Sequence, residues 1–414
     1  MKFDNYNISN EIKRNLDDLG FKKPTDIQFK SIPPILKGED VLAIAQTGTG
    51  KTAAFAIPII GKLQNSRELG FGKEGIKCLV MVPTRELAIQ ITEVFNKIGK
   101  STKIQAFCLF GGVEQERQVF KLEQGIDILI ATPGRMFDLI YQKHLKITGV
   151  EILVLDEADH MLDLGFIKDI QDVKKFLPSR HQTLFFSATI NEQIKEIAYS
   201  LVKNPIRIQI SPKDPVAKNI THSVAFVEMD DKRFFLERVI NENADSKILV
   251  FVRTKVRAER VKAAMERVNI LSETIHGDKE QIDRLSVLNK FRTGEVKVLI
   301  ATDVSARGID IANVDYVVNY DLPDVPENYV HRVGRTGRGT QKGLAVSFCS
   351  VEEKPVLDEI EHFMGKTITV LDIDKKEYHK TLDFSIDTTN YDLKNLLLEV
   401  SDYENKHKKG KKKK

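Results

Sequence analysis

Two short motifs in the first half of the chain combine residue types that bind nucleoside triphosphates and activate water. The first, AQTGTGKT at 45–52, follows an apolar run and precedes a helical pattern, which is the context of a phosphate-binding loop. Gly48 and Gly50 let backbone N–H groups turn toward phosphate oxygens, and Lys51 adds a positive charge for the β- and γ-phosphates. The Thr52 hydroxyl is a ligand for Mg²⁺, so the motif predicts a triphosphate site.

The second motif, VLDEAD at 154–159, ends an apolar run with carboxylates. Asp156 suits Mg²⁺, through water, because Mg²⁺ keeps part of its hydration shell. Glu157 lies one residue further on, where it can either orient or deprotonate the attacking water. Taken alone, the same letters also fit an acidic helix start in which Asp156 or Asp159 is the N-cap. Together with the upstream phosphate-binding loop, the VLDEAD motif favours a site that hydrolyses a nucleoside triphosphate.

A third motif, HRVGRTGR at 331–338, places three arginines and a histidine around two glycines far downstream. The planar guanidinium fork suits phosphate oxygens of any source. Taken alone, the segment is an exposed basic loop or an RNA contact. An ATP site elsewhere in the chain favours a role on the γ-phosphate for Arg335 and Arg338.

The segment GFKKPTDIQ at 20–28 bears on the choice of nucleotide. The Gln28 amide both donates and accepts, so it can pair with N6 and N7 of adenine. Phe21 can stack on the base. The alternative is a loop before a helix in which Gln28 is solvated.

The elements that must hold these motifs are short apolar runs separated by amphipathic stretches. The runs at 40–45, 78–82, 126–131, 151–156 and 183–188 are typical of buried strands. Such strands, alternating with helical patterns, indicate a parallel sheet with crossover helices. A parallel sheet delivers the side chains that follow its strands to a cleft at one edge.

The pattern breaks at 211–219, where prolines and charges are typical of an exposed linker. Strand-like runs then resume at 247–252, 297–302, 316–320 and 344–348. The chain therefore has the pattern of two α/β domains in tandem. The pattern decays after about residue 370, and one short helix is expected at 391–400.

The charge of the chain is concentrated at its end. The formal net charge is +4, yet residues 406–414 contain seven lysines, so the remainder carries −3. A run this dense is expected to be disordered and to bind RNA or DNA electrostatically, although a solubilising tail fits the same letters. Three scattered cysteines, no membrane-length apolar run and a polar start favour a cytoplasmic protein without a membrane partner.

The order of the motifs resembles that of the DEAD-box RNA helicases, which are superfamily 2 ATPases. Residues 20–28 resemble the family's Q motif, and the letters from Asp156 to Asp159 are the motif that names it. Phe3 falls where the family carries an isolated upstream aromatic residue. Further segments follow in family order: PTRELA (83–88), Gly111-Gly112, TPGR (132–135), SAT (187–189), FVRT (251–254), Gln281 with Arg284, ATDVSARGID (301–310) and 331–338. Asp26, His160 and Ile190-Asn191 depart from the family pattern without touching the groups assigned to chemistry.

This resemblance implies two RecA-like domains, each a mostly parallel sheet flanked by helices, with ATP in the cleft between them. The expected boundaries are 1–208 for the ATP-binding domain, 209–219 for the linker, 220–370 for the helicase domain and 371–414 for an extension with the lysine tail.

The resemblance also implies roles for individual residues. The second domain would bring Arg335 and Arg338 to the γ-phosphate, while His331 holds a water network near Glu157 and Arg332 is structural. The residues implied for ATP are Phe21, Gln28, Thr47, Gly48, Thr49, Gly50, Lys51, Thr52 and Asp310, with Thr52 and Asp156 for Mg²⁺. The residues implied for RNA are Thr84, Arg85, Gly112, Thr132, Gly134, Arg135, Arg253, Thr254, Gln281, Arg284 and Thr302. Ser187 and Thr189 would couple the two sites.

The implied activity is RNA-dependent ATP hydrolysis with local, non-processive unwinding of short RNA duplexes and remodelling of RNA–protein complexes. Contacts of this kind address sugars and phosphates, so little sequence specificity is expected. An ATP-gated RNA clamp and a DNA-directed helicase of the same superfamily are the alternatives. The short basic extension resembles the bacterial RhlE-type subgroup, which implies ribosomal or RNA-decay partners. A monomer is expected.

Overall fold

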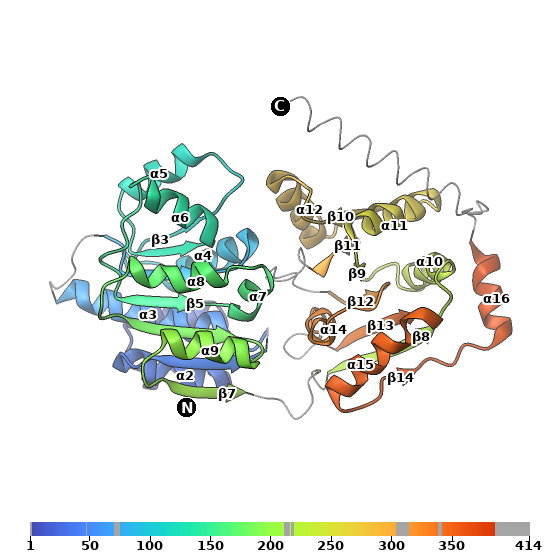
Figure 1. Cartoon of the computed structure of the whole chain (residues 1–414), viewed down its shortest axis with the longest axis horizontal. Helices are drawn as coiled ribbons and strands as arrows, with labels where there is room; N and C mark the ends of the chain where they lie inside the picture. The colour runs from blue at the N-terminus through green and yellow to red at the C-terminus, as the bar shows by residue number, and fades with distance from the viewer. Residues whose placement is uncertain are drawn as a thin grey trace.

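The computed structural model describes residues 2–46, 48–69, 75–210, 216, 219–303, 314–337 and 342–385. Within these residues the chain forms two α/β domains that lie side by side (Figure 1). Each domain contains a seven-stranded sheet in which all the described strand pairs are parallel. Thr47, Asp310, Arg338 and the predicted helix at 391–400 lie outside the described residues.

The first domain contains the elements from η1 to β7. Its strands are β1 (Val41–Ala45), β2 (Cys78–Met81), β3 (Ala106–Leu109), β4 (Ile128–Ala131), β5 (Ile152–Leu155), β6 (Gln182–Ser187) and β7 (Ile206–Ile210). Its helices are η1 (Phe3–Asn5), α1 (Asn10–Asp18), α2 (Asp26–Lys37), α3 (Lys51–Glu68), α4 (Arg85–Ile98), α5 (Gln115–Glu123), α6 (Pro133–Tyr141), α7 (Ala158–Asp163), α8 (Ile167–Asp172), η2 (Val173–Lys175) and α9 (Glu192–Leu201).

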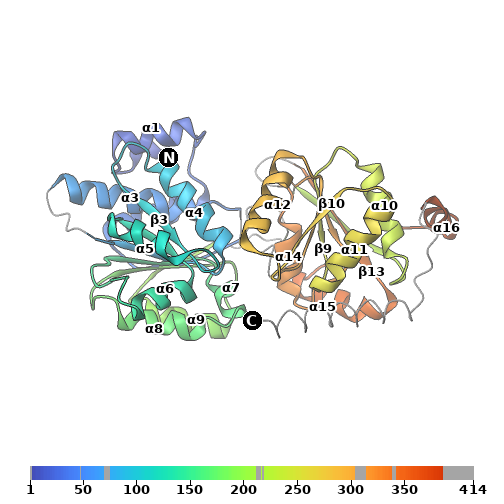
Figure 2. The same ribbon diagram turned by 90° about the horizontal axis from the view of Figure 1, so that it is seen from above.

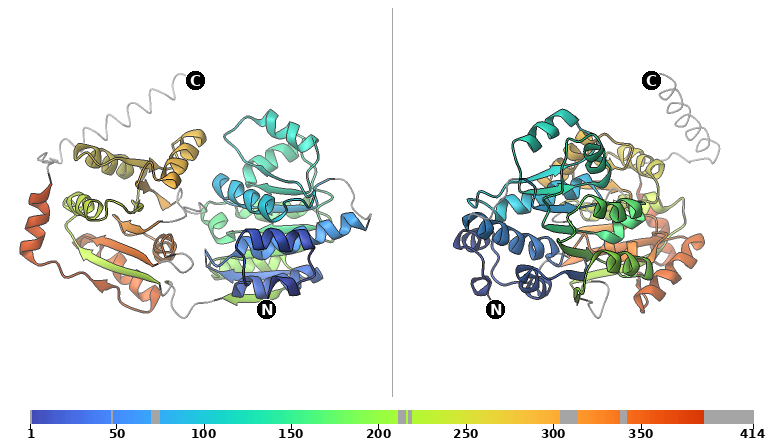
Figure 3. Two further views of the ribbon diagram at one scale, coloured as in Figure 1. Left: turned by 180° about the vertical axis from the view of Figure 1, so that it is seen from behind. Right: turned by 60° about the vertical axis from the view of Figure 1, so that its left-hand side comes forward.

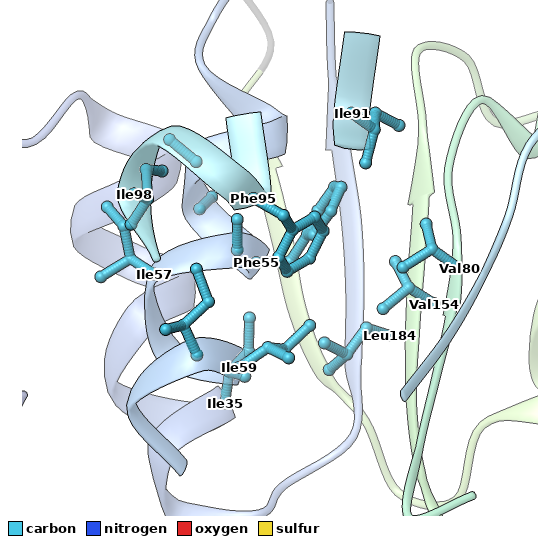
Figure 4. Packing of buried hydrophobic residues seen from close by; sticks show 14 of the residues in the cluster. Ile35, Phe55, Ile57, Ile59, Val80, Ile91, Phe95, Ile98, Val154 and Leu184 are labelled. Atoms are coloured by element: carbon cyan, nitrogen blue, oxygen red, sulfur yellow. The ribbon is translucent and has the colours of Figure 1, made fainter. Parts of the chain in front are cut away.

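The first sheet has the strand order β3-β4-β2-β5-β6-β1-β7, and its two faces are covered by different helices. Alternate side chains of each strand point to opposite faces, so Val41 packs under α1–α4 while Leu42 packs under α6–α9. Phe55 of α3 and Phe95 of α4 meet Val154 and Leu184 of the sheet in the core on the first of these faces (Figure 4). This packing holds β1 and β5, which precede the phosphate loop and the DEAD letters.

The second domain repeats this plan. Its strands are β8 (Ile220–Phe226), β9 (Ile248–Phe251), β10 (Ser272–Ile275), β11 (Val298–Ala301), β12 (Tyr316–Asn319), β13 (Gly343–Cys349) and β14 (Thr369–Val370). Its helices are α10 (Lys232–Glu242), α11 (Lys255–Arg267), α12 (Gln281–Thr293), α14 (Pro326–Val333), η3 (Val351–Glu353), α15 (Lys354–Met364) and α16 (Lys375–Phe384). The strand order is β10-β11-β9-β12-β13-β8-β14.

The helices of the second domain also divide between two faces. Helices α10, α11 and α16 pack on one face, and α12, α14 and α15 pack on the other. Helices α12 and α14 lie on the side of the first domain, whereas α16 lies at the far end (Figures 2 and 3). Helix α16 was not expected from the sequence, and Tyr378 and Glu377 tie it to α10 through Phe235 and Arg238.

The predicted fold class, two tandem RecA-like domains with parallel sheets, is confirmed. All nine predicted strands form. The unpredicted strands are β3, β7, β8, β10 and β14, of which four are sheet edges. The predicted domain boundaries stay predictions, and most of the linker lies outside the described residues. No helix in the described part of the chain is long and apolar enough to span a membrane.

Candidate functional site

The phosphate loop connects β1 to α3 at the carboxyl edge of the first sheet. Gly48 and Gly50 have φ of +81° and +92°, in the left-handed region that favours glycine. A Cβ on Gly50 would lie 2.5 Å from Nε2 of Gln28, so a side chain there would displace the Gln28 amide from the loop. The Thr49 hydroxyl donates to the Gln46 carbonyl at 2.8 Å. Lys51 begins α3, so the unpaired N–H groups at the start of that helix face the loop.

Gln28 lies against this loop rather than in solvent. Its side chain is buried, Nε2 donates to the Gly50 carbonyl at 3.2 Å and Oε1 accepts from Thr25 N at 3.0 Å. The solvated alternative for Gln28 is therefore wrong. The amide still has one N–H and one lone pair for a base. Phe21 packs edge-on against the buried Phe3 ring at 6.0 Å between centroids, so the isolated upstream aromatic supports the Q-motif loop.

Lys51 and Asp156 are buried charged groups at the base of the loop. Among the described residues, Lys51 Nζ has no hydrogen-bond partner, which is expensive for a buried ammonium unless a ligand supplies an acceptor. Burial raises the pKa of the Asp156 carboxyl to about 7, an effect that Lys51 opposes and Glu157 reinforces. Both groups therefore gain from a bound phosphate and a cation.

Glu157 joins β5 to α7 with φ of +52°, which is uncommon for a residue with a side chain. Its Oε2 lies 3.5 Å from Nδ1 of His160. Burial alone raises the pKa of Glu157, but the neighbouring His160, Lys51 and Arg335 lower that pKa to about 2. Glu157 is therefore an ionised carboxylate at neutral pH.

Asp159 connects this motif to the SAT segment. Its Oδ2 accepts from Ala188 N at 3.1 Å, Thr189 N at 2.9 Å and Thr189 Oγ1 at 3.1 Å. The Ser187 hydroxyl donates to the Thr189 carbonyl at 2.7 Å. Neither Asp156 nor Asp159 caps α7 through its side chain, so the capping alternative for these residues is wrong.

Residues from both domains line one pocket of about 170 Å³. The first domain contributes Glu157, Asp159 and Thr189, and the second contributes His331 and Arg335. Arg335 is buried and its Nε donates to the His331 carbonyl at 3.3 Å. The downstream arginine motif therefore reaches the DEAD letters across the domain boundary.

Arg332 has a structural role, as expected. It is the largest fully buried side chain of the described residues, and its Nε and Nη2 donate to Asp303 at 2.6 and 2.7 Å. Its Nη1 donates to the Asp321 carbonyl at 2.7 Å. These bonds fix α14, and with it the position of Arg335.

The predicted RNA residues of the first domain lie at helix starts and turns. Thr84 caps α4 by accepting from Leu87 N at 3.3 Å, and Thr132 precedes α6. Arg85 passes over Gly112, whose φ is +78° and where any Cβ would collide with the guanidinium. The remaining two are Gly134 and Arg135, of which the second donates to the Val113 carbonyl.

Two of the predicted RNA residues of the second domain, Gln281 and Arg284, contact the start of α4 in the first domain. Gln281 Nε2 and Arg284 Nη2 lie 3.1 and 3.0 Å from Oε1 of the buried Glu86, and Arg85 Nη1 lies 3.4 Å from Gln281 Oε1. Thr254 caps α11 by accepting from Arg257 N at 3.2 Å. The other two are Arg253, which pairs with Asp324 and Glu353, and Thr302, which follows β11.

Sequence reasoning missed Glu86 as a functional candidate, along with the contact of Asp159 with the SAT segment. Glu86 lies in the PTRELA motif and Asp159 in the DEAD motif, so membership of these motifs could have marked both residues as functional candidates. Their partners are distant in sequence, and only the fold brings these together. Among the described residues, no cluster of three His, Cys, Asp or Glu groups is arranged to hold a metal unaided.

Comparison with known proteins agrees with this geometry. The family model described as DEAD/DEAH box helicase matches residues 25–197, and that described as helicase conserved C-terminal domain matches 231–340. The DEAD-box ATP-dependent RNA helicase CshA of Bacillus cereus is 40% identical over 367 residues, which cover 88% of this chain and 68% of CshA. The DEAD-box ATP-dependent RNA helicase RhpA of Helicobacter pylori is 39% identical over 374 residues, covering 88% and 75% of the two chains.

Solved structures show the same two-domain arrangement. Dbp5 of S. cerevisiae bound to RNA and ADP BeF3 superposes with a TM-score of 0.81, at 31% identity, over 92% of this chain and 99% of Dbp5. The DEAD-box helicase Mss116 bound to ssRNA and UDP-BeF superposes with a TM-score of 0.83, at 28% identity, over 93% and 82%. The motifs, the fold and these similarities agree: the chain belongs to the DEAD-box family and is an ATP-dependent RNA helicase.

Proposed function

We propose that this helicase hydrolyses ATP only while RNA and ATP hold its two domains together, and that each closure separates a few base pairs of a short RNA duplex. The observation that carries this proposal is the shared pocket, in which Glu157 of the first domain and Arg335 of the second line one space. A site divided between two domains makes hydrolysis conditional on their closure.

The triphosphate binds at the loop between β1 and α3. The Lys51 ammonium, which has no hydrogen-bond partner in the described part of the chain, neutralises the β- and γ-phosphates, while Gly48 and Gly50 expose backbone N–H groups to them. The Thr52 hydroxyl and Asp156 fit Mg²⁺, which when bound offsets the charge that develops on the phosphates. The adenine lies at Phe21 and Gln28, whose amide is already oriented by Gly50 and Thr25.

Glu157 orients the attacking water instead of removing its proton. A general base works best when its pKa is near the operating pH, and the pKa of Glu157 is about 2. An ionised carboxylate in a buried site still fixes a water molecule by accepting its hydrogen bonds. Arg335 stabilises the charge that spreads over the equatorial oxygens of the transferring phosphoryl group.

RNA closes the domains through the residues at helix starts on both of them. Glu86 bridges α4 and α12 by accepting from Gln281 and Arg284, which supports a closed arrangement of the two halves. Because RNA and ATP each contact both domains, each favours the closed state and strengthens the binding of the other. The similarity to Dbp5 bound to RNA and ADP BeF3 supports this arrangement.

RNA is held mainly through sugars and phosphates, with little sequence specificity. The 2′-OH gives such a track a means of preferring RNA to DNA. We extend the proposal to a monomer in the cytoplasm with ribosomal or RNA-decay partners. The RhlE-type subgroup stays a prediction.

We expect single-stranded RNA, and not DNA of matched sequence, to stimulate ATP hydrolysis by the full chain. The Arg85→Ala variant should need about tenfold more RNA for half-maximal rate, because a phosphate contact is lost. The measurement is steady-state phosphate release against nucleic-acid concentration. The matched control is Arg117→Ala, whose side chain is 85% exposed and pairs with Glu114, the N-cap residue of its own helix α5. Equal stimulation by DNA would move the assignment to a DNA-directed helicase.

The dependence on Mg²⁺ should change with pH. A metal-bound carboxylate must be ionised, and the pKa of Asp156 is about 7, so a proton competes with Mg²⁺ below that pH. The half-maximal Mg²⁺ concentration for ATP hydrolysis should be about tenfold higher at about pH 6 than at about pH 8. Asp156→Asn should remove this difference, and the fully exposed Asp245→Asn should retain it. The same half-maximal concentration at both pH values would contradict the assignment.

A further inference from the structure

A second pocket, of about 250 Å³, lies between α10 and α11 of the second domain and shares no lining residue with the pocket formed by both domains. Four arginines line it: Arg233 of α10 and Arg257, Arg260 and Arg267 of α11. Helices α10 and α11 pack on the same face of the sheet (Figure 2). The pocket is therefore a site of concentrated guanidinium groups that ATP hydrolysis does not use.

The carboxylates of this pocket do not balance its arginines. Asp230 and Asp231 are the two acidic lining residues, and Asp231 already accepts from the Tyr378 hydroxyl at 2.7 Å. Among the described residues, Arg260 has no ion-pair or hydrogen-bond partner. The lining thus carries two more positive than negative charges, which favours an anionic ligand.

Two of the guanidinium groups are held in place by aromatic rings. The Arg257 guanidinium lies 5.4 Å from the centre of the buried Tyr320 ring, and its Nε lies 3.2 Å from Asp321 Oδ1. The Arg233 guanidinium lies 4.4 Å from the centre of the Phe234 ring. Ring contacts of this kind fix the plane of each guanidinium, and the Arg257 Nη2 also donates to Met229 Sδ at 2.8 Å, so both groups are oriented within the pocket.

The pocket continues from the proposed RNA track. Thr254, a predicted RNA contact, caps α11 and accepts from the backbone N–H of Arg257. The positions of Arg257, Arg260 and Arg267 recur at helical spacing along the pocket side of α11. Ten residues of helix extend about 15 Å, enough for about four phosphates at the spacing of a stacked strand.

We propose that these four arginines bind the phosphates of a single RNA strand that leaves the track at Thr254 and continues along α11. The proposal rests on the proposed function, because it extends that RNA track. Because the arginine pocket adjoins Thr254 of the proposed RNA track, we favour RNA over an acidic peptide as its ligand. The ligand is recognised by its phosphates, so the pocket lengthens the bound strand without reading its sequence.

The test compares binding of two oligouridylates, of about 6 and about 14 nucleotides, to the full chain with a non-hydrolysable ATP analogue. For Arg233→Gln/Arg260→Gln, affinity for the longer strand should fall about tenfold at about 0.1 M salt, and the slope of log K against log salt should become shallower by about 1.4. Affinity for the shorter strand should not change. The lysine tail is present throughout, so its contribution cancels.

Lys290→Gln/Lys297→Gln is the matched control, because it removes two positive charges that pair with Glu295 and Asp245 outside the pocket. Unchanged affinity and salt slope for the longer strand in the arginine variant would overturn the proposal. So would binding of an oligoglutamate peptide that this variant abolishes while RNA binding persists. Failure of the track itself is distinguishable, because Arg85→Ala would then leave the affinity for both strands unchanged.

Discussion

Replacing Arg335 with alanine is expected to slow RNA-stimulated ATP hydrolysis by about 10³-fold or more, while ATP and RNA still bind. Arg335 lines the shared pocket with Glu157 but belongs to the second domain, so it contributes to hydrolysis only when the domains are closed. Its guanidinium stabilises charge that develops in the transition state, and such a contact affects the rate more than ground-state binding.

Single-turnover phosphate release with saturating RNA would measure this loss, and a fluorescent ATP analogue would report binding. Arg335→Lys keeps the charge but loses the planar fork, so we expect it to recover only part of the rate. Arg117→Ala, on an exposed helix of the first domain, should hydrolyse ATP at the wild-type rate. A tenfold or smaller loss in Arg335→Ala would mean that the shared pocket is not where phosphoryl transfer is promoted.

The second large effect is expected for Glu157→Gln, which should lower the hydrolysis rate by about 10²-fold or more, because the attacking water loses its orientation. The amide has the shape of the carboxylate, but it offers one acceptor oxygen and no charge to hold the attacking water. ATP and RNA should bind as before, and RNA should dissociate more slowly because the closed state persists until hydrolysis.

The rate of RNA release in the presence of ATP distinguishes this expectation from simple damage to the site. A damaged site would lose RNA affinity, whereas a stalled closed state would retain RNA. Glu192→Gln is the matched control, because Glu192 lies in the first turn of α9 and its side chain is 85% exposed. Fast RNA release together with slow hydrolysis in Glu157→Gln would contradict the role proposed for Glu157.

The sequence predicted the inner strands of both sheets better than the edges. All five inner strands of the first sheet and four of the five in the second appear as continuous apolar runs, because both their faces are covered by helices. Strands β3, β7, β10 and β14 are edges. Exposed or half-buried side chains weaken the apolar signal of β3, β7 and β14, whereas β10 is mostly buried but consists largely of polar residues, Ser272, Glu273 and Thr274. The inner strand missed was β8, whose burial is interrupted over Thr221, His222 and Ser223.

The sequence predicted those parts of the candidate site whose residues lie within one short motif. Lys51 and Asp156 follow strands that lie close together in the sheet, and their residue types alone indicate phosphate and Mg²⁺. The bridge from Glu86 to Arg284 was not predictable, because it joins residues about two hundred positions apart. The Asp159 contacts with Thr189 depend on the packing of α7 against β6, which local spacing does not determine.

The left-handed backbone conformation of Glu157 lowers the stability of the fold at a residue that ATP hydrolysis requires. A residue with a side chain in this conformation costs on the order of 1–3 kcal/mol, and glycine would relieve most of that strain. A selection for heat resistance alone would therefore favour losing Glu157, and an engineer who screened only for folded protein would discard the helicase activity without noticing. Any programme to stabilise this protein should hold Glu157 constant and look for its gains elsewhere.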